Sequence, residues 1–213
     1  MTRGRLLTLL AVVVALIGAF ALRPGAARHE GPTRASATAG QVGPPASAPP
    51  TARPDPLASL RAKAALTACP TGLSAALPDL VLGCLGGGPA VHLRAQGSGL
   101  PTLVNVYGSW CGPCQEEMPV LTAFARRAGG RVALVGVDTN DDPRMALQFA
   151  SDVGQHWPAV VDDDKAVLRR YSSGPPVTLF LDGSGRLAYV KRGPFRSLAD
   201  LRATVSRELG VRV

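Results

Sequence analysis

Two cysteines separated by two residues, Cys111 and Cys114, are the side chains of this sequence best suited to chemistry. Residues 103–107 before them form an apolar run typical of a strand, and apolar residues recur after them at helical spacing. At such a junction, unpaired N–H groups and the helix dipole stabilise a thiolate on the first cysteine. The spacing therefore predicts that Cys111 attacks, and that Cys114, one turn later, closes a disulfide and releases the attacked partner.

A pair of this kind has two other interpretations. As half of a zinc site it would need two more ligands, but no second pair with matching spacing is present. The candidates are scattered singly: Cys69, Cys84, His92 and His156. As a purely structural disulfide it would close a ring so short that the unfolded chain is hardly constrained. We therefore expect a redox-active pair, with no metal and no cofactor.

The residues around the pair predict a strand–helix–strand unit. The helix after Cys114 carries one apolar face, made of Met118, Leu121, Phe124 and Ala128. It is expected to end at Gly129 and Gly130, since glycine adopts the left-handed conformation at helix ends. Residues 132–137 form a nearly continuous apolar run, as in a strand in the middle of a sheet that is covered on both faces.

Further elements follow, and together they indicate a layered α/β domain. Asp142 as N-cap and Pro143 at the first helical position predict a helix with Met145, Phe149 and Val153 on one face. Three aspartates at 162–164 fit a turn and helix cap, because no EF-hand spacing surrounds them. The other predicted elements are a helix over 57–66, a hairpin of strands 80–85 and 90–93, a helix over 164–171, strands over 177–181 and 187–192, and a closing helix opened by Ser197.

The cysteine motif is accompanied by two further characteristic stretches. The three are Val-Asn-Val-Tyr-Gly-Ser-Trp-Cys-Gly-Pro-Cys-Gln-Glu-Glu-Met-Pro (104–119), Gly-Val-Asp (136–138) and Gly-Pro-Pro-Val-Thr-Leu-Phe-Leu-Asp (174–182). Their combination, with Trp110, Gly112 and Pro113 inside the redox motif, resembles the TlpA/ResA-type branch of the thioredoxin family, which are membrane-anchored extracytoplasmic redox proteins. The match covers roughly residues 78–210. It implies a thioredoxin-like fold, a mixed central β-sheet flanked by helices, with an N-terminal β-hairpin and the helical insertion of that branch over 141–157.

The resemblance also implies roles for residues near the pair. Pro176 falls on the family's cis-proline, which lies beside the two sulfurs and leaves the backbone of Pro175 and Val177 free to pair with a client peptide. Glu117, three residues after Cys114, matches an acidic residue that accepts and returns the proton of the resolving thiol. The alternatives are an ordinary Pro-Pro loop for the proline and an exposed helix charge for the glutamate.

Three neighbouring positions complete the comparison. Asn105 occupies the place where cytosolic thioredoxins carry a buried aspartate, so that proton route is absent and Glu117 is the better candidate. Glu116 is expected to face solvent, and Pro119 falls on the family's helix-kink proline.

The two remaining cysteines, Cys69 and Cys84, are expected to pair, because an exported protein with an even cysteine count favours disulfides. Such a bond would close a loop of about 16 residues, for which the chain-entropy model gives on the order of 3 kcal/mol. We predict a structural disulfide that fastens the N-terminal helix to the hairpin. The alternative is a second redox pair.

The start of the sequence predicts export. Arg3 and Arg5 precede an apolar run over residues 6–22, which is long for a signal-peptide core and short for a spanning helix. An A-x-A-like cleavage pattern lies at residues 19–21. The expected division of the chain is residues 1–22 as signal-anchor or signal peptide, residues 23–56 as a disordered tether rich in proline and alanine, and residues 57–213 as the thioredoxin-like domain.

These features predict a single-pass protein of the cell membrane with an extracytoplasmic catalytic domain, or a secreted one if the first segment is cleaved. The formal net charge of +8 is spread along the chain without a basic cluster interleaved with aromatic residues, so nucleic acid is not an expected partner. The expected partners are client proteins with thiols or disulfides, and a redox partner in or outside the membrane.

The resulting functional hypothesis is a thiol-disulfide oxidoreductase, serving cytochrome c maturation, as the family resemblance implies, or disulfide quality control. A disulfide-forming oxidase of secreted proteins is the alternative within the same chemistry. A copper-delivery module is the alternative from another class, although that function favours a C-x-x-x-C pair with a distal histidine. A peroxidase is excluded by the lack of the P-x-x-x-T-x-x-C context of a peroxidatic cysteine.

Overall fold

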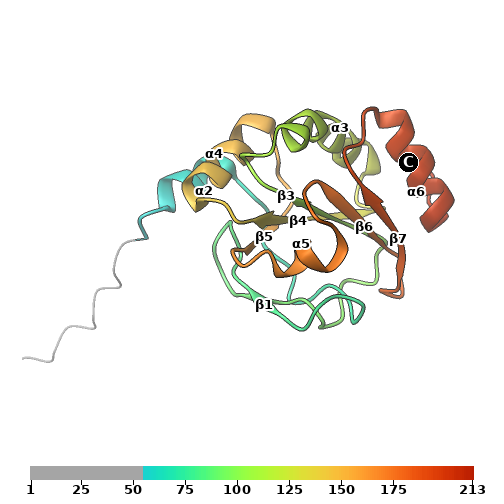
Figure 1. The fold of residues 1–213 in the computed structure, drawn as a ribbon, viewed down its shortest axis with the longest axis horizontal. Helices are drawn as coiled ribbons and strands as arrows, with labels where there is room; N and C mark the ends of the chain where they lie inside the picture. The colour runs from blue at the N-terminus through green and yellow to red at the C-terminus, as the bar shows by residue number, and fades with distance from the viewer. Residues whose placement is uncertain (1–54) are drawn as a thin grey trace, which may run out of the picture. The chain divides into compact units, whose positions relative to one another are not determined.

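The computed structural model describes residues 55–213, which form an α/β unit around a five-stranded sheet (Figure 1). Its strands are β3 (Thr102–Tyr107), β4 (Ala133–Thr139), β5 (Ala159–Asp162), β6 (Val177–Leu181) and β7 (Leu187–Arg192). The expected anchor over residues 1–22 and nearly all of the expected tether lie outside the described residues. In the part that is described, no helix is both long enough and apolar enough to cross a bilayer.

The sheet has the strand order β5-β4-β3-β6-β7, with β3 at its centre. All six residues of β3 are buried, including the polar Thr102 and Asn105, as is typical of a central strand covered on both faces. β4 runs parallel to β3, and β5 runs parallel to β4. β6 is antiparallel to β3, and β7 is antiparallel to β6. The C-terminal ends of β3, β4, β5 and β7 and the N-terminal end of β6 therefore lie along one side of the sheet, which we call the carboxyl edge.

Helices cover both faces of this sheet (Figure 1). The elements are α2 (Ala58–Ala64), α3 (Gly112–Ala128), α4 (Pro143–Val153), α5 (Ala166–Tyr171), α6 (Leu198–Leu209) and the hairpin strands β1 (Val81–Leu82) and β2 (Val91–His92). Apolar side chains of α3 and α6 pack with Leu103 and Phe180 on one face. Side chains of α5 and of β2 pack with Val104 and Leu179 on the other. The result is a thioredoxin-like fold with a mixed sheet, as predicted.

The helix ends follow the expected local chemistry. The carboxylate of Asp142 accepts the N–H groups of Arg144 and Met145 at the start of α4, and Ser197 accepts the N–H of Asp200 at the start of α6. Gly129 ends α3 in the left-handed conformation, with φ of 55°. The N-caps and the glycine stop were therefore readable from sequence.

The structure differs from the sequence analysis at three places. Of the apolar face predicted for α4, Phe149 and Val153 pack against the core, but Met145 is 58% exposed, because α4 also packs through the small residues Ala146 and Ala150. Strand β5 was not predicted, because its four residues follow a proline and run into the acidic turn. α5 begins at Ala166 rather than at 164, because the buried carboxylate of Asp162 accepts the first N–H groups of the helix.

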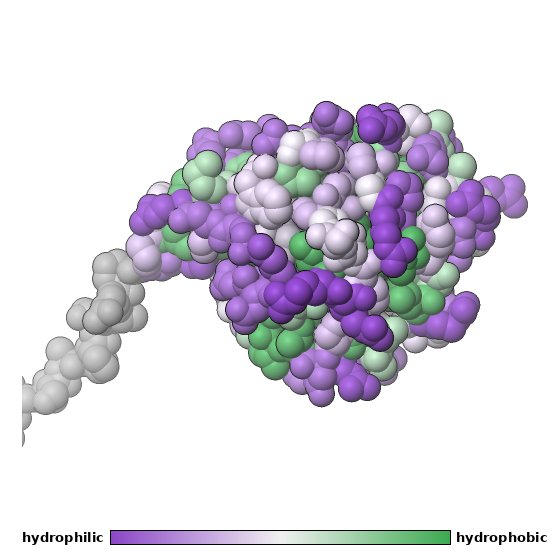
Figure 2. Space-filling model, in the orientation of Figure 1, coloured by the Kyte–Doolittle hydropathy of each residue, from purple (hydrophilic) through white to green (hydrophobic). Residues whose placement is uncertain are grey.

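Hydrophilic side chains cover most of the face shown in Figure 2, and hydrophobic ones form only small patches. Among the described residues, the large hydrophobic side chains with the greatest exposure are Val81, Leu100, Trp110 and Met145. Trp110 is 52% exposed and precedes Cys111 directly.

Cys69 and Cys84 are joined by a disulfide, with an S–S distance of 2.02 Å and a Cα–Cα distance of 6.0 Å. Cys69 lies in the segment after α2, and Cys84 follows β1 and forms an isolated bridge with Val160 of β5. The bond therefore ties the N-terminal segment to the hairpin region, beside the edge strand of the sheet.

Replacing both cysteines (Cys69→Ser with Cys84→Ser) is expected to lower the free energy of unfolding by about 3 kcal/mol, because the unfolded chain regains the entropy of a loop with a sequence separation of 15. Chemical denaturation of the oxidised proteins measures the difference. Disulfide exchange by Cys111 and Cys114 in the folded double variant is the control and should persist. Loss of exchange in a variant that remains folded would support the alternative of a second redox pair.

Candidate active site

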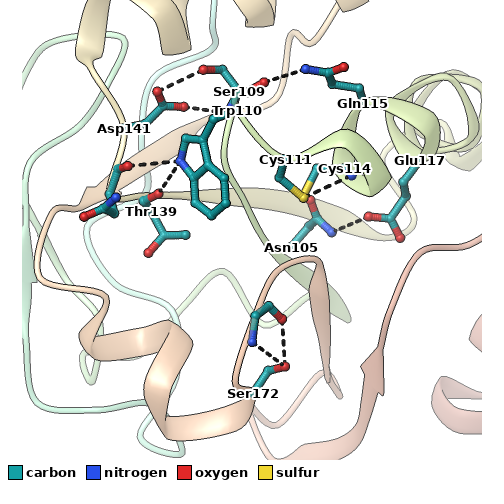
Figure 3. The surroundings of a disulfide bond; sticks show 12 residues. Asn105, Ser109, Trp110, Cys111, Cys114, Gln115, Glu117, Thr139, Asp141 and Ser172 are labelled. Carbon is teal, nitrogen blue, oxygen red and sulfur yellow. Dashed lines mark hydrogen bonds between the residues drawn. A yellow bond between two sulfur atoms is a disulfide. The ribbon is translucent and has the colours of Figure 1, made fainter.

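Cys111 and Cys114 lie at the start of α3, where the chain leaves the carboxyl edge of the sheet. Their sulfurs are bonded at 2.08 Å, and their Cα atoms are 5.2 Å apart. Cys111 is the N-cap, and its Sγ receives the N–H of Cys114 at 3.2 Å (Figure 3). Cys111 is 5% exposed and Cys114 is 1% exposed. Cys111 is thus slightly more exposed than Cys114, and its sulfur is the one that lies at the N–H groups of the helix start, which favour a negative charge.

The turn before Cys111 is held by the loop between β4 and α4. Both the N–H and the hydroxyl of Ser109 donate to the carboxylate of Asp141. The indole Nε1 of Trp110 donates to the carbonyl of Asn140 at 3.0 Å (Figure 3). Gly108 is required here, since a Cβ at that position would lie 2.6 Å from this indole nitrogen. These contacts place the exposed tryptophan ring beside the cysteine pair.

Glu117 is buried beneath the pair rather than exposed, so the alternative of a solvent-facing helix charge is wrong. It is 1% exposed, its Oε2 accepts from Asn105 Nδ2 at 3.0 Å, and its Oε1 accepts from the N–H of Phe195 at 2.9 Å. Burial raises the pKa of Glu117, although these two hydrogen bonds and the charge of Lys191 favour the ionised form. Glu116, one residue earlier, faces solvent as predicted.

Asn105 has a role that sequence reasoning missed. The sequence indicated only that Asn105 occupies the place of the buried aspartate of cytosolic thioredoxins, so that proton transfer through such an aspartate is absent. In the structure its amide nitrogen donates both to Glu117 and to Thr178 Oγ1, each at 3.0 Å. Because Thr178 lies two residues after Pro176, this one amide connects the buried carboxyl to the strand that carries the proline.

Pro176 directly precedes β6, on the carboxyl edge, and the Pro175–Pro176 peptide bond is cis. The carbonyl of Pro176 accepts the N–H of Gly193 at 2.9 Å, whereas Pro175 is partly exposed. Val177 was expected to contact clients, but it is fully buried and lies in β6 between β3 and β7. Its side chain is therefore part of the core, and only the segment before it is open to a partner.

A second buried carboxyl belongs to Asp138, at the C-terminal end of β4. The sequence indicated no role for it beyond its place in the Gly-Val-Asp stretch. It is 0% exposed, and neither of its side-chain oxygens has a hydrogen-bond partner. Burial, followed by the charge of Asp141, raises the pKa of Asp138 to about 8. Its register partner on β3 is Tyr107, whose hydroxyl is also buried without a partner. The position of an aspartate at the end of a buried strand was the only available signal.

No group of three or more His, Cys, Asp and Glu side chains converges on a potential metal position within residues 55–213. The structure therefore adds no support to the copper-delivery alternative, and it brings together Cys111, Cys114 and Glu117 as a set suited to sulfur and proton chemistry.

Comparison with known proteins points in the same direction. A family model described as Redoxin matches residues 73–212. The chain is 36% identical over 94 residues to a thiol:disulfide interchange protein DsbE homolog of Paracoccus denitrificans, covering 43% of this chain and 50% of that protein. It is 31% identical over 121 residues to the thiol-disulfide oxidoreductase ResA of Geobacillus kaustophilus, covering 54% of this chain and 67% of that protein. The chain thus spans about half the length of the first relative and two thirds of the second.

Solved structures show the same fold. Similarity to MTB dsbF has a TM-score of 0.54 at 25% identity, covering 63% of this chain and 98% of that one. A secreted disulfide oxidoreductase of Mycobacterium tuberculosis gives a TM-score of 0.51 at 22% identity, covering 61% of this chain and 96% of that one.

Asp138 generates a prediction about stability and pH. Its pKa is raised from 3.8 to about 8 on folding, so between these values the folded state holds a proton that the unfolded chain has lost. Stability should therefore fall as pH rises through this window. Asp138→Asn keeps the shape without the titration, so its melting temperature should fall less than that of the parent between pH 5 and 8.

Melting curves at half-unit pH intervals test this, with the exposed Asp200 of α6 as control, since its charge does not act on Asp138 and Asp200→Asn should keep the parental slope. Parallel curves for the parent and Asp138→Asn would show that this carboxyl is not protonated by folding.

Proposed function

The chain belongs to the redoxin family, and on that premise we propose that it is a thiol-disulfide oxidoreductase whose Cys111–Cys114 pair exchanges electrons with client proteins. The observation that carries this proposal is the asymmetry of the pair. The sulfur of Cys111 caps the helix and accepts the N–H of Cys114, whereas Cys114, bonded to it, lies inside the first turn and is the less exposed of the two residues, at 1% against 5%. Such an arrangement supports a nucleophile and a resolving thiol rather than a metal site.

In the reduced protein the thiolate of Cys111 attacks a client disulfide. The bond between Cys111 and one client sulfur forms as the client S–S bond breaks, and the other client sulfur leaves as a thiolate. Cys114 then loses its proton and attacks Cys111, so that the Cys111–Cys114 bond forms and the second client sulfur leaves. Two electrons have passed to the client. The reverse sequence, starting from the oxidised pair and client thiols, oxidises the client.

Glu117 is suited to take the proton of Cys114 and to return it. It lies one helical turn after Cys114, on the same side of α3, and is sealed from water. A carboxyl with a raised pKa is a better proton acceptor for a thiol than an ordinary surface glutamate, because its proton affinity lies closer to that of the thiol. Asn105 and the N–H of Phe195 hold it in place.

Client docking is proposed to use the exposed ring of Trp110 and the backbone before Pro176. Pro175 is itself a proline, so this residue offers a client only its carbonyl oxygen and no N–H. Backbone pairing at this point is therefore reduced to one acceptor.

We further propose that the protein works outside the cytoplasm, tethered by its N-terminal segment or released by cleavage. The names of the relatives as thiol:disulfide interchange proteins support clients with thiols or disulfides. The resemblance to the TlpA/ResA-type branch makes cytochrome c maturation the first task to test, with a membrane or extracytoplasmic redox partner.

The proposed roles of the two sulfurs predict a trapping experiment. Cys114→Ser removes the resolving thiol, so a client disulfide attacked by Cys111 should stay bound as a covalent adduct. Insulin serves as probe, and intact mass under non-reducing conditions measures the adduct. Cys111→Ser is the matched control and should form none. Equal adduct formation by the two variants would contradict the assignment of the attacking sulfur.

The role of Glu117 predicts a split between the two steps of exchange. In Glu117→Gln the closing step, release of the client by Cys114, should slow by about tenfold or more, and its rate should no longer follow the ionisation of this carboxyl as pH rises. The first step, measured as alkylation of Cys111, should change far less. Stopped-flow release of a peptide from the Cys111 mixed disulfide between pH 5 and 9 measures this.

Glu116→Gln is the control, because Glu116 lies on the same helix but faces solvent. If both variants release the peptide at the parental rate and with the same pH profile, Glu117 does not carry the proton.

A further inference from the structure

The carboxyl edge carries acidic loops at one end. The loop after β4 contains Asp141 and Asp142, and the turn after β5 contains Asp163 and Asp164. Asp142, Asp163 and Asp164 are exposed, and Asp141 is half-buried, where it holds the turn before Cys111. Because β4 and β5 both lie on the same side of β3 in the sheet, all four carboxylates lie on one side of the cysteine pair.

The other end of the same edge is basic. β7 ends at Arg192, and the segment that follows contains Arg196, whose side chain is 80% exposed. Arg192 Nε donates to the carbonyl of Tyr171 at 2.8 Å, and the guanidinium of Arg170 lies 6.0 Å from the ring centre of that tyrosine. These arginines therefore border the loop that leads into Pro175.

Neighbouring charges of opposite sign reduce this separation without cancelling it. Arg144 and Lys165 lie among the four acidic residues, which leaves two negative charges in excess. At the basic end, Lys191 and the exposed Arg169, which precedes Arg170 in α5, add to the three arginines, whereas Glu116, 3.8 Å from Arg196, and Asp200 oppose them. Three positive charges remain in excess there. The cysteine pair lies between the two ends, because β3 is the central strand.

We propose that this charge gradient selects the clients of the redox pair: the fitting partner is a polypeptide whose cysteine is flanked by acidic residues toward the end of β7 and by basic residues toward the ends of β4 and β5. This inference rests on the proposed function, since it concerns the same site. A residue three positions from the client cysteine lies about 10 Å from it in an extended chain. At 0.01 M salt, where the Debye length is about 30 Å, the exposed charges of the edge act over such a distance, whereas at physiological salt, where it is about 8 Å, they are partly screened.

This charge gradient has a larger share in client recognition because the backbone beside Pro176 offers few hydrogen bonds to a client. Pro175 has no N–H to donate, so a client loses one of the directional contacts that would otherwise set its orientation. Charge complementarity across the cysteine pair supplies orientation instead, and it accelerates association with correctly directed clients.

Two peptides of identical composition provide the test. One carries three aspartates before a single cysteine and three lysines after it, and the other has the reverse order. Each is supplied as a mixed disulfide with 5-thio-2-nitrobenzoate. Attack by Cys111 of the reduced full chain forms the Cys111–peptide bond and releases this coloured thiolate, which gives the rate directly. Net charge and leaving group are the same, so a difference in rate reports a directional field.

At low ionic strength the two rates should differ by about fivefold, and the difference should vanish at high salt. The variant Arg170→Ser with Arg196→Ser should reduce the difference in rate between the two peptides at low ionic strength. The matched control, Arg126→Ser with Arg127→Ser, removes the same charge from the far end of α3 and should leave it unchanged.

Equal rates for the two peptides at low salt, a difference that survives high salt, or one that the Arg170 and Arg196 variant leaves intact would each overturn the inference. If both peptides react rapidly and equally, the proposed oxidoreductase stands and only the gradient fails. If neither peptide releases the thiolate, the proposed function itself fails.

Discussion

The N–H groups at the start of α3 have no partner within the helix, and the sulfur of Cys111 occupies the N-cap position that meets them. A thiolate at this position is stabilised by the N–H groups of the helix itself. The rest of the structure holds this helix start at the carboxyl edge of the sheet. β3 delivers the chain to the centre of the carboxyl edge, Asp141 holds the turn, and the cis-proline segment approaches from β6.

The second constraint is the burial of carboxyl groups behind the redox pair. Glu117 and Asp138 lie on the α3 side of the sheet, where ionisation is costly. The two carboxyl groups differ in their hydrogen-bond partners. Glu117 has two hydrogen-bond donors and a nearby lysine, which keep its ionised form within reach, whereas Asp138 has no partner for either oxygen. A carboxyl that takes up and returns a proton needs partners that stabilise its ionised form, as Glu117 has. A carboxyl that stays protonated can lack such partners, as Asp138 does.

Two segments outside the regular strands and helices support the site from the side of β4 and β5. The loop after β4 positions Trp110, and the Cys69–Cys84 disulfide ties the N-terminal segment beside β5. Because these segments all reach the region of β4 and β5, the acidic end of the carboxyl edge is built on a supported part of the fold. At the basic end, Arg196 lies in the segment after β7, and the hydrogen bonds of Lys191 to three carbonyls hold that segment in shape.

The sequence by itself determined the features that depend on neighbours in the chain. The cysteine spacing, the caps at Asp142 and Ser197 and the glycine stop at Gly129 are local, and they were readable for that reason. The resemblance also located Glu117 and Pro176. Only the tertiary structure decided which faces are buried. Met145 points outward because α2 and its alanines cover the other side of α4, and Val177 is enclosed by strands distant in sequence. The contact of Asn105 with Glu117 and the isolation of Asp138 likewise arise where β3, β4 and α3 meet, because burial and pKa depend on groups that the fold brings together from far along the chain.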